Sequence, residues 1–295
     1  MPTALNYASA YQAALAQAYP YVLHFAALRS TENDGRYKWT GAKTIEIPSL
    51  STTGRVDGSR DTIGTATRNF NNAWEPKTLG NHRKWSTLVH PMDIDETNHV
   101  ASIQNITKVF NEEQKFPEMD AYLVSKVYSD WGAAGRTADT DALTVDNILI
   151  KFDAWMEAMD EANVPTAGRI LYLRPAANTL MKQAIEKYRT IQNGDAAIQR
   201  AIKSLDDVQI EKVPSTLMKT VYDFTEGWKA GSGAKQINAL LIHPSAVITP
   251  EKYAFAQLEA PSALSEGKYV YFEESYEDVF VLNKRLDAIM FNTEA

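Results

Sequence analysis

The chain has 295 residues, of which 44% are hydrophobic and 23% are charged, a mixture typical of a globular protein. Its 30 Lys and Arg against 37 Asp and Glu give a formal net charge of −7, which disfavours coating nucleic acid as the main role. Cysteine is absent, which excludes disulfides, a thiolate nucleophile and cysteine-ligated metals. No apolar run approaches the ~18 residues of a membrane span, so we expect no membrane partner.

The N-terminal residues 1–28 are rich in Ala and Tyr and lack the basic start and continuous apolar stretch of an export signal. Apolar residues at every fourth position predict one face of a helix. These residues are Tyr7, Tyr11, Leu15 and Tyr19. Pro20 is expected to end that helix. Two interpretations stay open: a short helix that caps its own core, or an arm that docks on a neighbouring subunit.

Residues 29–92 predict a long β-hairpin with a polar tip. Tyr37, Trp39, Ile45 and Ile47 lie at alternating positions, as in a strand, and Pro48 is expected to break it. Residues 51–72 are almost all polar. A second extended stretch is expected to run from residue 74 to 79 and from 85 to 92.

Such a hairpin is expected to need a partner. Arms of this kind reach roughly 40–50 Å at about 3.3 Å per residue, and an isolated two-stranded ribbon is marginally stable in water. Another copy of the chain is the simplest cover. A loop left in solvent is the alternative, but its Trp and Ile content disfavours it. The residues expected to contact a neighbouring subunit are Ile45, Ile47, Arg55, Arg60, Asp61, Arg68 and Trp74.

The three arginines near the tip of the hairpin could bind DNA or carboxylates of a protein partner. Asp57 and Asp61 alternate with them in the sequence. This alternation favours salt bridges across a protein interface over a nucleic-acid patch.

A long helix is predicted over residues 98–131. Residues 93–98 supply carboxylates and capping side chains at its start. Apolar residues then recur at three- and four-residue spacing, and Pro117 suits the first turn of a second segment after a kink. Gly132 and Gly135 are expected to end the helix.

From about residue 140 the pattern is mixed α/β. Helices are expected at 145–159, 175–188 and 244–258. Strands are expected at 170–173, 208–213, 237–242, 269–272, 279–282 and 288–291. No internal repeat or low-complexity linker is visible, so we expect interleaved domains.

The sequence offers little catalytic chemistry. The histidines lack zinc-binding spacing, and the glycines and lysine of 231–235 lack the spacing of a phosphate-binding loop. No nucleophile elbow or dinucleotide fingerprint is present. An acidic cluster at 90–96 is better explained as a solvated helix start than as a metal site. We therefore predict no catalytic, metal-binding or cofactor-binding residue and no cofactor. The unusual segments of the sequence, which are the N-terminal arm, the long hairpin and the long helix, instead indicate a protein that assembles with other subunits.

Three stretches resemble the major capsid proteins of tailed bacteriophages, which share the Hong Kong 97 fold. The first comprises 43–48, 51–54, Trp74 and 92–97. The second resembles a spine-helix motif and comprises Pro117, Glu118, Met119, Asp120 and Tyr122, followed by Ser125 and Lys126. The third is the C-terminal order of 240–247 and 276–284.

The resemblance implies an α+β capsid fold with five parts. They are an N-terminal arm (1–28), an extended loop (29–92), a spine helix with a peripheral domain (93–138), an axial domain (139–259) and a return to the peripheral domain (260–295).

The resemblance also implies pentamers and hexamers that close into an icosahedral virion shell around double-stranded DNA, assembled in the bacterial host cytoplasm. A separate scaffolding protein, a portal, a decoration protein and non-specific DNA contacts are expected as partners. The alternatives are an encapsulin-like nanocompartment shell and an α/β enzyme with a mobile lid at 30–92.

Overall fold

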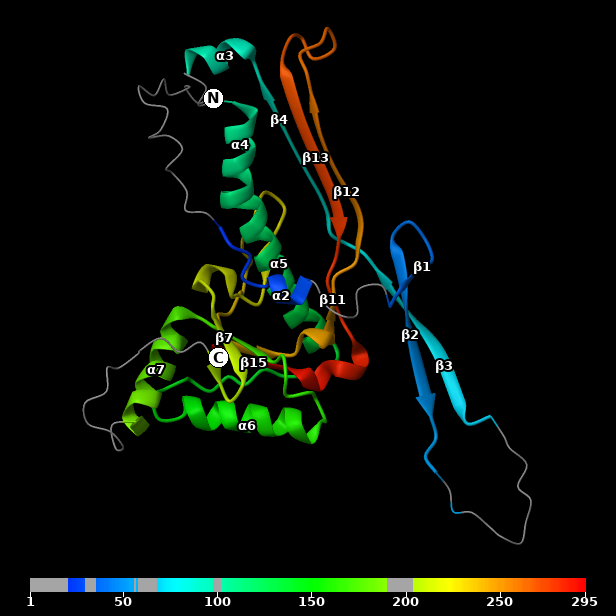
Figure 1. Ribbon diagram of the computed structural model, residues 1–295, viewed down its shortest axis with the longest axis vertical. Coiled ribbons are helices and arrows are strands. Elements are labelled where there is room, and N and C mark those ends of the chain that lie inside the picture. Colours follow the sequence, from blue (N-terminus) through cyan, green and yellow to red (C-terminus); the bar gives the residue numbers. More distant parts are fainter. Residues whose placement is uncertain (1–20, 30–35, 56, 58–67, 98–101, 190–203) are drawn as a thin grey trace.

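Two sheets and a projecting ribbon organise the chain (Figure 1). The computed structural model describes residues 21–29, 36–55, 57, 68–97, 102–189 and 204–295. A five-stranded sheet with its helices forms a broad body, an elongated three-stranded sheet rises from it beside a long helix, and a ribbon leaves in the opposite direction. The helix predicted at 7–19 lies outside the described residues.

The five-stranded sheet has the order β15-β10-β5-β7-β6. Its strands are β5 (Ile170–Leu173), β6 (Ser204–Leu205), β7 (Val208–Lys212), β10 (Ile237–Ile242) and β15 (Ile289–Thr293). Only β5 and β7 run parallel within it. β5 and β10 are buried along their whole length, because both faces of the sheet are covered. The strands predicted in these regions are confirmed.

Alternate residues of the central strands face two hydrophobic clusters. Leu171 and Leu241 lie in the cluster with α6 (Ile148–Glu161) and α7 (Pro175–Arg189). Tyr172 and Leu240 lie in the cluster with α5 (Phe116–Ala133) on the other face. The two-residue period of a strand thus produces a three-layered body. The helices predicted at 145–159 and 175–188 are confirmed as α6 and α7.

The elongated sheet consists of β12 (Glu251–Glu259), β13 (Tyr269–Glu277) and β4 (His82–Val89), all antiparallel with β13 in the middle. The long helix covers one face of it. Trp85 of β4 stacks on Phe110 with ring centroids 3.8 Å apart. Lys115 forms an ion pair with Glu273 at 3.1 Å.

The long helix comprises α4 (Ile103–Phe110), a π-helical turn (Asn111–Lys115) and α5. Ser102 caps its start by accepting a hydrogen bond from the Asn105 N–H at 3.4 Å. The π-helical turn precedes Pro117, whose ring removes one N–H and would clash with a regular helical carbonyl. The predicted spine helix is thus confirmed over its described residues, with a π-helical turn at the expected interruption.

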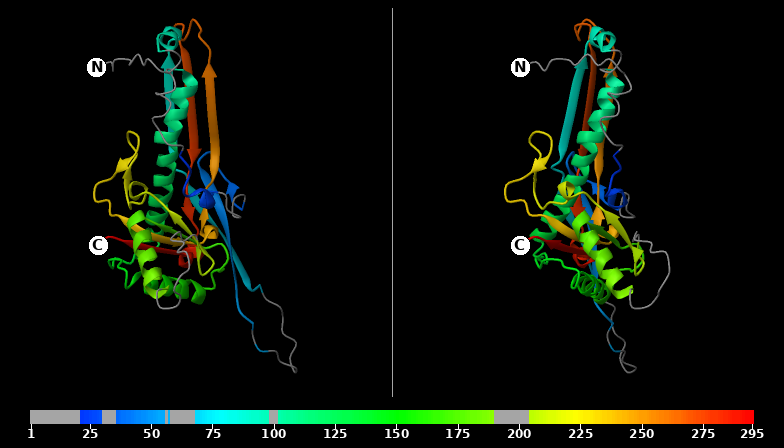
Figure 2. Two further views of the ribbon diagram at one scale, coloured as in Figure 1. Left: turned by 60° about the vertical axis from the view of Figure 1, so that its left-hand side comes forward. Right: turned by 90° about the vertical axis from the view of Figure 1, so that its left-hand side faces the viewer.

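The ribbon is formed by β2 (Thr44–Thr52) and β3 (Phe70–Thr78), with β1 (Lys38–Trp39) beside its root. Both views in Figure 2 show it leaving the body. The prediction that Pro48 breaks the first strand is wrong. β1 pairs with β2 only at Ile45 and Glu46, so Pro48 sits where the outer edge of β2 needs no donor.

Two further predictions are wrong. The second arm of the hairpin was expected to include residues 85–92, but these lie mainly in β4, which pairs with β13 in the other sheet. The helix expected at 244–258 is instead a short 3-10 turn (Pro244–Ala246), β11 (Val247–Ile248) and most of β12. Pairing with β13 overrides the helical propensity of its Ala, Gln and Leu residues.

The remaining elements are short. β11 pairs with β14 (Phe280–Val281), and β8 (Tyr222–Asp223) pairs with β9 (Lys229–Ala230). The helices α2 (Ala26–Arg29) and α3 (Pro91–Glu96) and the 3-10 turns Ser215–Leu217 and Asn283–Ala288 complete the described elements. None of the described helices is both long and apolar enough to cross a membrane.

Strand pairing crosses the domain limits expected at 259 and 260. β12, from the expected axial segment, belongs to the elongated sheet, whereas β15, from the expected return segment, belongs to the five-stranded sheet. The division of the chain into five parts stays a proposal.

Candidate assembly interface

One face of the ribbon carries exposed apolar side chains. Cross-strand partners share a face, and the register pairs Pro48 with Trp74 and Thr52 with Phe70. Leu50 lies on the same face because it follows Pro48 by two residues. Trp74 is 48% exposed, Leu50 60% and Phe70 52%. We call Pro48, Leu50, Phe70 and Trp74 the apolar stripe.

The opposite face of the outer ribbon carries small and polar side chains. Ser49 pairs with Ala73, and Ser51 with Asn71. A ribbon that is apolar on one face only is suited to lie on another surface, whereas a solvated hairpin would be polar on both faces. Burying a large apolar side chain completely stabilises by about 1.5–3 kcal/mol. Burial of the apolar stripe against a neighbouring copy would therefore contribute substantially to the free energy of association.

The root of the ribbon belongs to the chain's own core. Ile45 is 0% exposed and clusters with Leu79, Ile248 and Phe280. The prediction that Ile45 contacts a neighbouring subunit is therefore wrong, because its own chain already surrounds it. Ile47 is half-buried against the same cluster.

Two hydrogen bonds join the ribbon to the turn that follows β14. Asn283 Nδ2 donates to Glu75 Oε2 at 2.7 Å, and Lys284 Nζ donates to the Leu50 carbonyl at 2.6 Å. They hold both strands at the point where the ribbon leaves the body, and so define the direction in which the apolar stripe is presented.

The predicted arginines lie toward the tip of the ribbon. Arg55 is exposed, and no described carboxylate lies within ion-pair distance of it. The guanidinium carbon of Arg68 is 4.8 Å from the Phe70 ring centroid, so this arginine extends the stripe through a cation–π contact. Arg60 and Asp61 lie outside the described residues. The salt bridges expected across an interface stay a prediction.

The predicted spine motif is centred on a buried carboxylate. Asp120 accepts hydrogen bonds from Tyr21 Oη at 2.6 Å, the His24 N–H at 2.9 Å and the Phe25 N–H at 3.4 Å. Burial raises the pKa of the Asp120 carboxyl above its usual range, although these hydrogen bonds oppose the shift. Burial and the Asp120 charge likewise raise the pKa of the Tyr21 hydroxyl. Asp120 thereby fastens residues 21–25 to the spine helix.

Other motif residues also contact their own chain. Glu118 accepts from Arg83 Nε at 2.5 Å, and the same arginine donates to the Phe224 carbonyl at 2.6 Å. Arg83 thus joins the elongated sheet, the spine helix and the segment after β8. Tyr122 Oη donates to Asp278 Oδ1 at 2.7 Å.

The start of α5 also holds the end of the N-terminal segment. The Met119 carbonyl accepts from Arg29 Nη2 at 2.8 Å, and Arg29 forms an ion pair with Glu277 at 3.5 Å. Pro117, two residues before Met119, is also buried. The motif is therefore a junction within one chain.

The attachment of residues 21–29 to the body was only partly predicted. Of the two interpretations left open for residues 1–28, packing on the chain's own core fits the described part, because Phe25 and Leu28 are fully buried in the main core. The only sequence signal was the apolar pattern after Pro20. Their anchor on the spine helix lies 90 or more residues away in sequence, so no local pattern identifies it.

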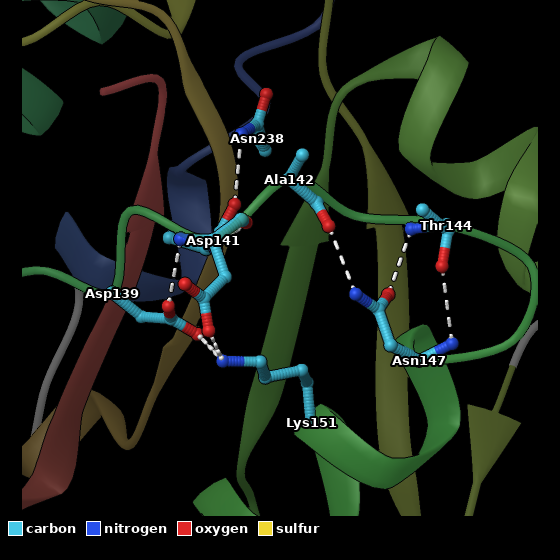
Figure 3. Close-up of polar contacts among 8 residues, drawn as sticks. Asp139, Asp141, Ala142, Thr144, Asn147, Lys151 and Asn238 are labelled. Atoms are coloured by element: carbon cyan, nitrogen blue, oxygen red, sulfur yellow. Dashed lines mark hydrogen bonds and ion pairs between the residues drawn. The ribbon is translucent and has the colours of Figure 1, made fainter.

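A lysine and two aspartates form a polar cluster beside α6 (Figure 3). Lys151 Nζ lies 2.9 Å from Asp139 and 2.5 Å from Asp141. Hydrogen bonds to Asp141 and Asp139 raise the pKa of the Lys151 amine, so it stays protonated and is not a nucleophile. The cluster fastens the segment before α6 to that helix. No group of three or more metal-ligating side chains that could hold a metal ion occurs among the described residues.

A projecting ribbon, a long helix backed by an elongated sheet, and a sheet-centred body together define the Hong Kong 97-type capsid fold. The predicted α+β fold class is thereby confirmed, and solved structures agree with it. A structure from Mycobacterium phage Che8 has a TM-score of 0.67 at 14% identity, covering 99% of this chain and 96% of that one. The mature capsid of bacteriophage PhiM1 has a TM-score of 0.64 at 12% identity, covering 86% and 82%.

The capsid of cyanophage P-SCSP1u is similarly close, with a TM-score of 0.64 at 14% identity over 95% of this chain and 90% of that one. No protein-family model matches the sequence, and the comparison with curated proteins also gives no match. At these identities the likeness concerns the fold.

Proposed function

We propose that this chain is the major capsid protein of a tailed double-stranded DNA phage. Copies associate as pentamers and hexamers that close into an icosahedral shell around the genome. One observation carries the proposal: the ribbon presents an apolar stripe that its own chain leaves exposed. The capsid fold of the similar structures supports it.

The position of the ribbon favours a closed assembly. The ribbon lies at one end of the molecule and the elongated sheet at the other. A contact between the ribbon of one copy and the elongated sheet of another joins two different surfaces and is therefore head-to-tail. Contacts of this kind form rings when the rotation between copies closes. Pentamers and hexamers are rings of this type.

The proposal also includes the location and the partners of the protein. The protein acts in the virion shell, is assembled in the host cytoplasm, and works without catalysis or a cofactor. A separate scaffolding protein, a portal and a decoration protein are its proposed partners besides other copies. The net charge of −7 suits a container that contacts packaged DNA without holding it tightly.

Electron microscopy of the purified chain, alone and after co-expression with a phage scaffolding protein, tests the proposal. We expect shells, tubes or ring-shaped capsomers. A chain that stays monomeric under every assembly condition would contradict it. Particles that carry an enzyme instead of nucleic acid would indicate a nanocompartment, and turnover by an isolated monomer would indicate an enzyme with a mobile lid.

A further inference from the structure

A cavity lies in the angle between the ribbon root and the body. Its volume is ≈ 210 Å³. Its apolar lining comes from β2, from the segment before β1, and from residues near β11 and β14. These residues are Tyr37, Ile47, Pro48, Ile248 and Leu282. We call this space the root cavity.

The rim of the root cavity is basic in a chain whose net charge is acidic. Arg36, Lys284 and Arg285 line it, against one carboxylate, Glu75. Within the described part of the chain, no carboxylate lies at ion-pair distance from Arg36 or Lys284. Glu75 already accepts a hydrogen bond from Asn283. The cavity therefore combines an apolar interior with surplus positive charge, and fits an apolar side chain flanked by carboxylates.

The helix α3 has this chemistry. Met92 is 60% exposed, and the same six-residue helix carries Asp93, Asp95 and Glu96. The helix lies at the far end of the elongated sheet, away from the ribbon root (Figures 1 and 2).

We propose that α3 of one copy docks at the root cavity of another copy, with Met92 in the cavity and the α3 carboxylates facing its basic rim. The inference rests on the proposed function and adds a second contact that shares only Pro48 with the apolar stripe. The two surfaces lie far apart within one chain, so only different copies can bring them together. Opposite charge then selects the register of the contact.

Cysteine pairing tests this contact directly, because the chain has no cysteine of its own. Ser49 lines the root cavity. The variant that carries both Met92→Cys and Ser49→Cys should form disulfide-linked oligomers when assembled particles are oxidised, since a disulfide requires Cα atoms within about 7 Å. Each single variant should stay unlinked. Particles of the double variant without cross-links, or cross-linking by Met92→Cys alone, would overturn the proposal.

A charge exchange gives an independent readout. Arg36→Glu and Asp95→Lys should each lose particles, and the two together should recover them. The matched control is Lys38→Glu, an exposed cation two residues from Arg36 that does not line the cavity; it should assemble like the unmodified chain. Single variants that assemble normally would contradict the contact. An unmodified chain that never assembles would instead contradict the proposed function.

Discussion

The two ends of the ribbon differ although they belong to the same pair of strands. At the root, Ile45 is enclosed by its own chain, and two side chains from the turn after β14 fix the strands. Further out, Trp74 and Phe70 are about half exposed on one face. The root contributes to the stability of the monomer, and the outer half provides a surface for another copy. One hairpin can therefore serve folding and assembly at positions only a few residues apart.

Placing a charge at the root should have the largest effect on the monomer. Ile45→Asp buries an unpaired carboxylate, and we expect a loss of about 4–5 kcal/mol in the free energy of unfolding. Soluble yield and urea denaturation measure it. Leu50→Asp, five residues along the same strand but exposed, is the matched control and should change monomer stability little. Equal losses in the two variants would remove the distinction between root and outer half.

Removing the buried carboxylate of the spine helix should be the next largest effect. Asp120→Ala leaves the Tyr21 hydroxyl and two backbone N–H groups without their acceptor, and we expect a loss of about 3 kcal/mol. Asp130→Ala on the same helix removes only a partly exposed pair with Lys126 and should cost about 0–1 kcal/mol. Denaturant titration compares the two. A small loss for Asp120→Ala would mean that residues 21–25 are not held by it.

The pH dependence of the free energy of unfolding should also reveal the raised pKa of the Asp120 carboxyl. Its folded-state pKa lies above the ordinary value of 3.8, so the native protein binds this proton more tightly than the unfolded chain. The resulting contribution is fully present below 3.8 and is lost as pH rises through the folded-state pKa.

Relative to Asp120→Asn, the unmodified protein should therefore lose stability with rising pH, by at most about 1.4 kcal/mol per pH unit in that window. Burial raises the pKa of Glu277 in the same direction, but this group is present in both proteins and cancels in the difference. Urea unfolding at a series of pH values measures that difference. A difference that is constant, or that grows in the opposite direction, would contradict the assignment.

The smallest effect should come from the hydrogen bonds at the ribbon root. Lys284→Met removes one exposed hydrogen bond to the Leu50 carbonyl, and such a bond contributes about 0.5–1.5 kcal/mol. We expect faster amide exchange in β2 and β3 with unchanged exchange in β10. Unchanged protection in the ribbon would show that the cluster around Ile45 alone determines its direction.

Local patterns predicted the parts of the fold that depend on local residues. β10 was recognisable because five of its six residues are apolar, and the spine helix because its apolar residues follow a helical period. β12 was not, since its Ala, Gln and Leu residues favour a helix and only its pairing with β13 makes it a strand. The partner of β4 was missed for the same reason: β13 lies almost 200 residues away.

The candidate interface was predicted in part. Trp74 was recognised as an apolar residue that needs a cover, and its exposure agrees with that interpretation. Ile45 was assigned to the same surface because strand alternation cannot tell which part of a hairpin the body encloses. The hydrogen bonds that join residues 21–25 to Asp120 were found only through the structure, since these partners are distant from Asp120 in sequence.

Assembly of Trp74→Ala, measured beside the melting temperature of its monomer, tests the central claim most directly. If the apolar stripe is reserved for another copy, particles seen by electron microscopy should disappear while the melting temperature stays that of the unmodified monomer. Normal particles, or a melting temperature that falls together with assembly, would show that Trp74 supports its own chain and would contradict the account.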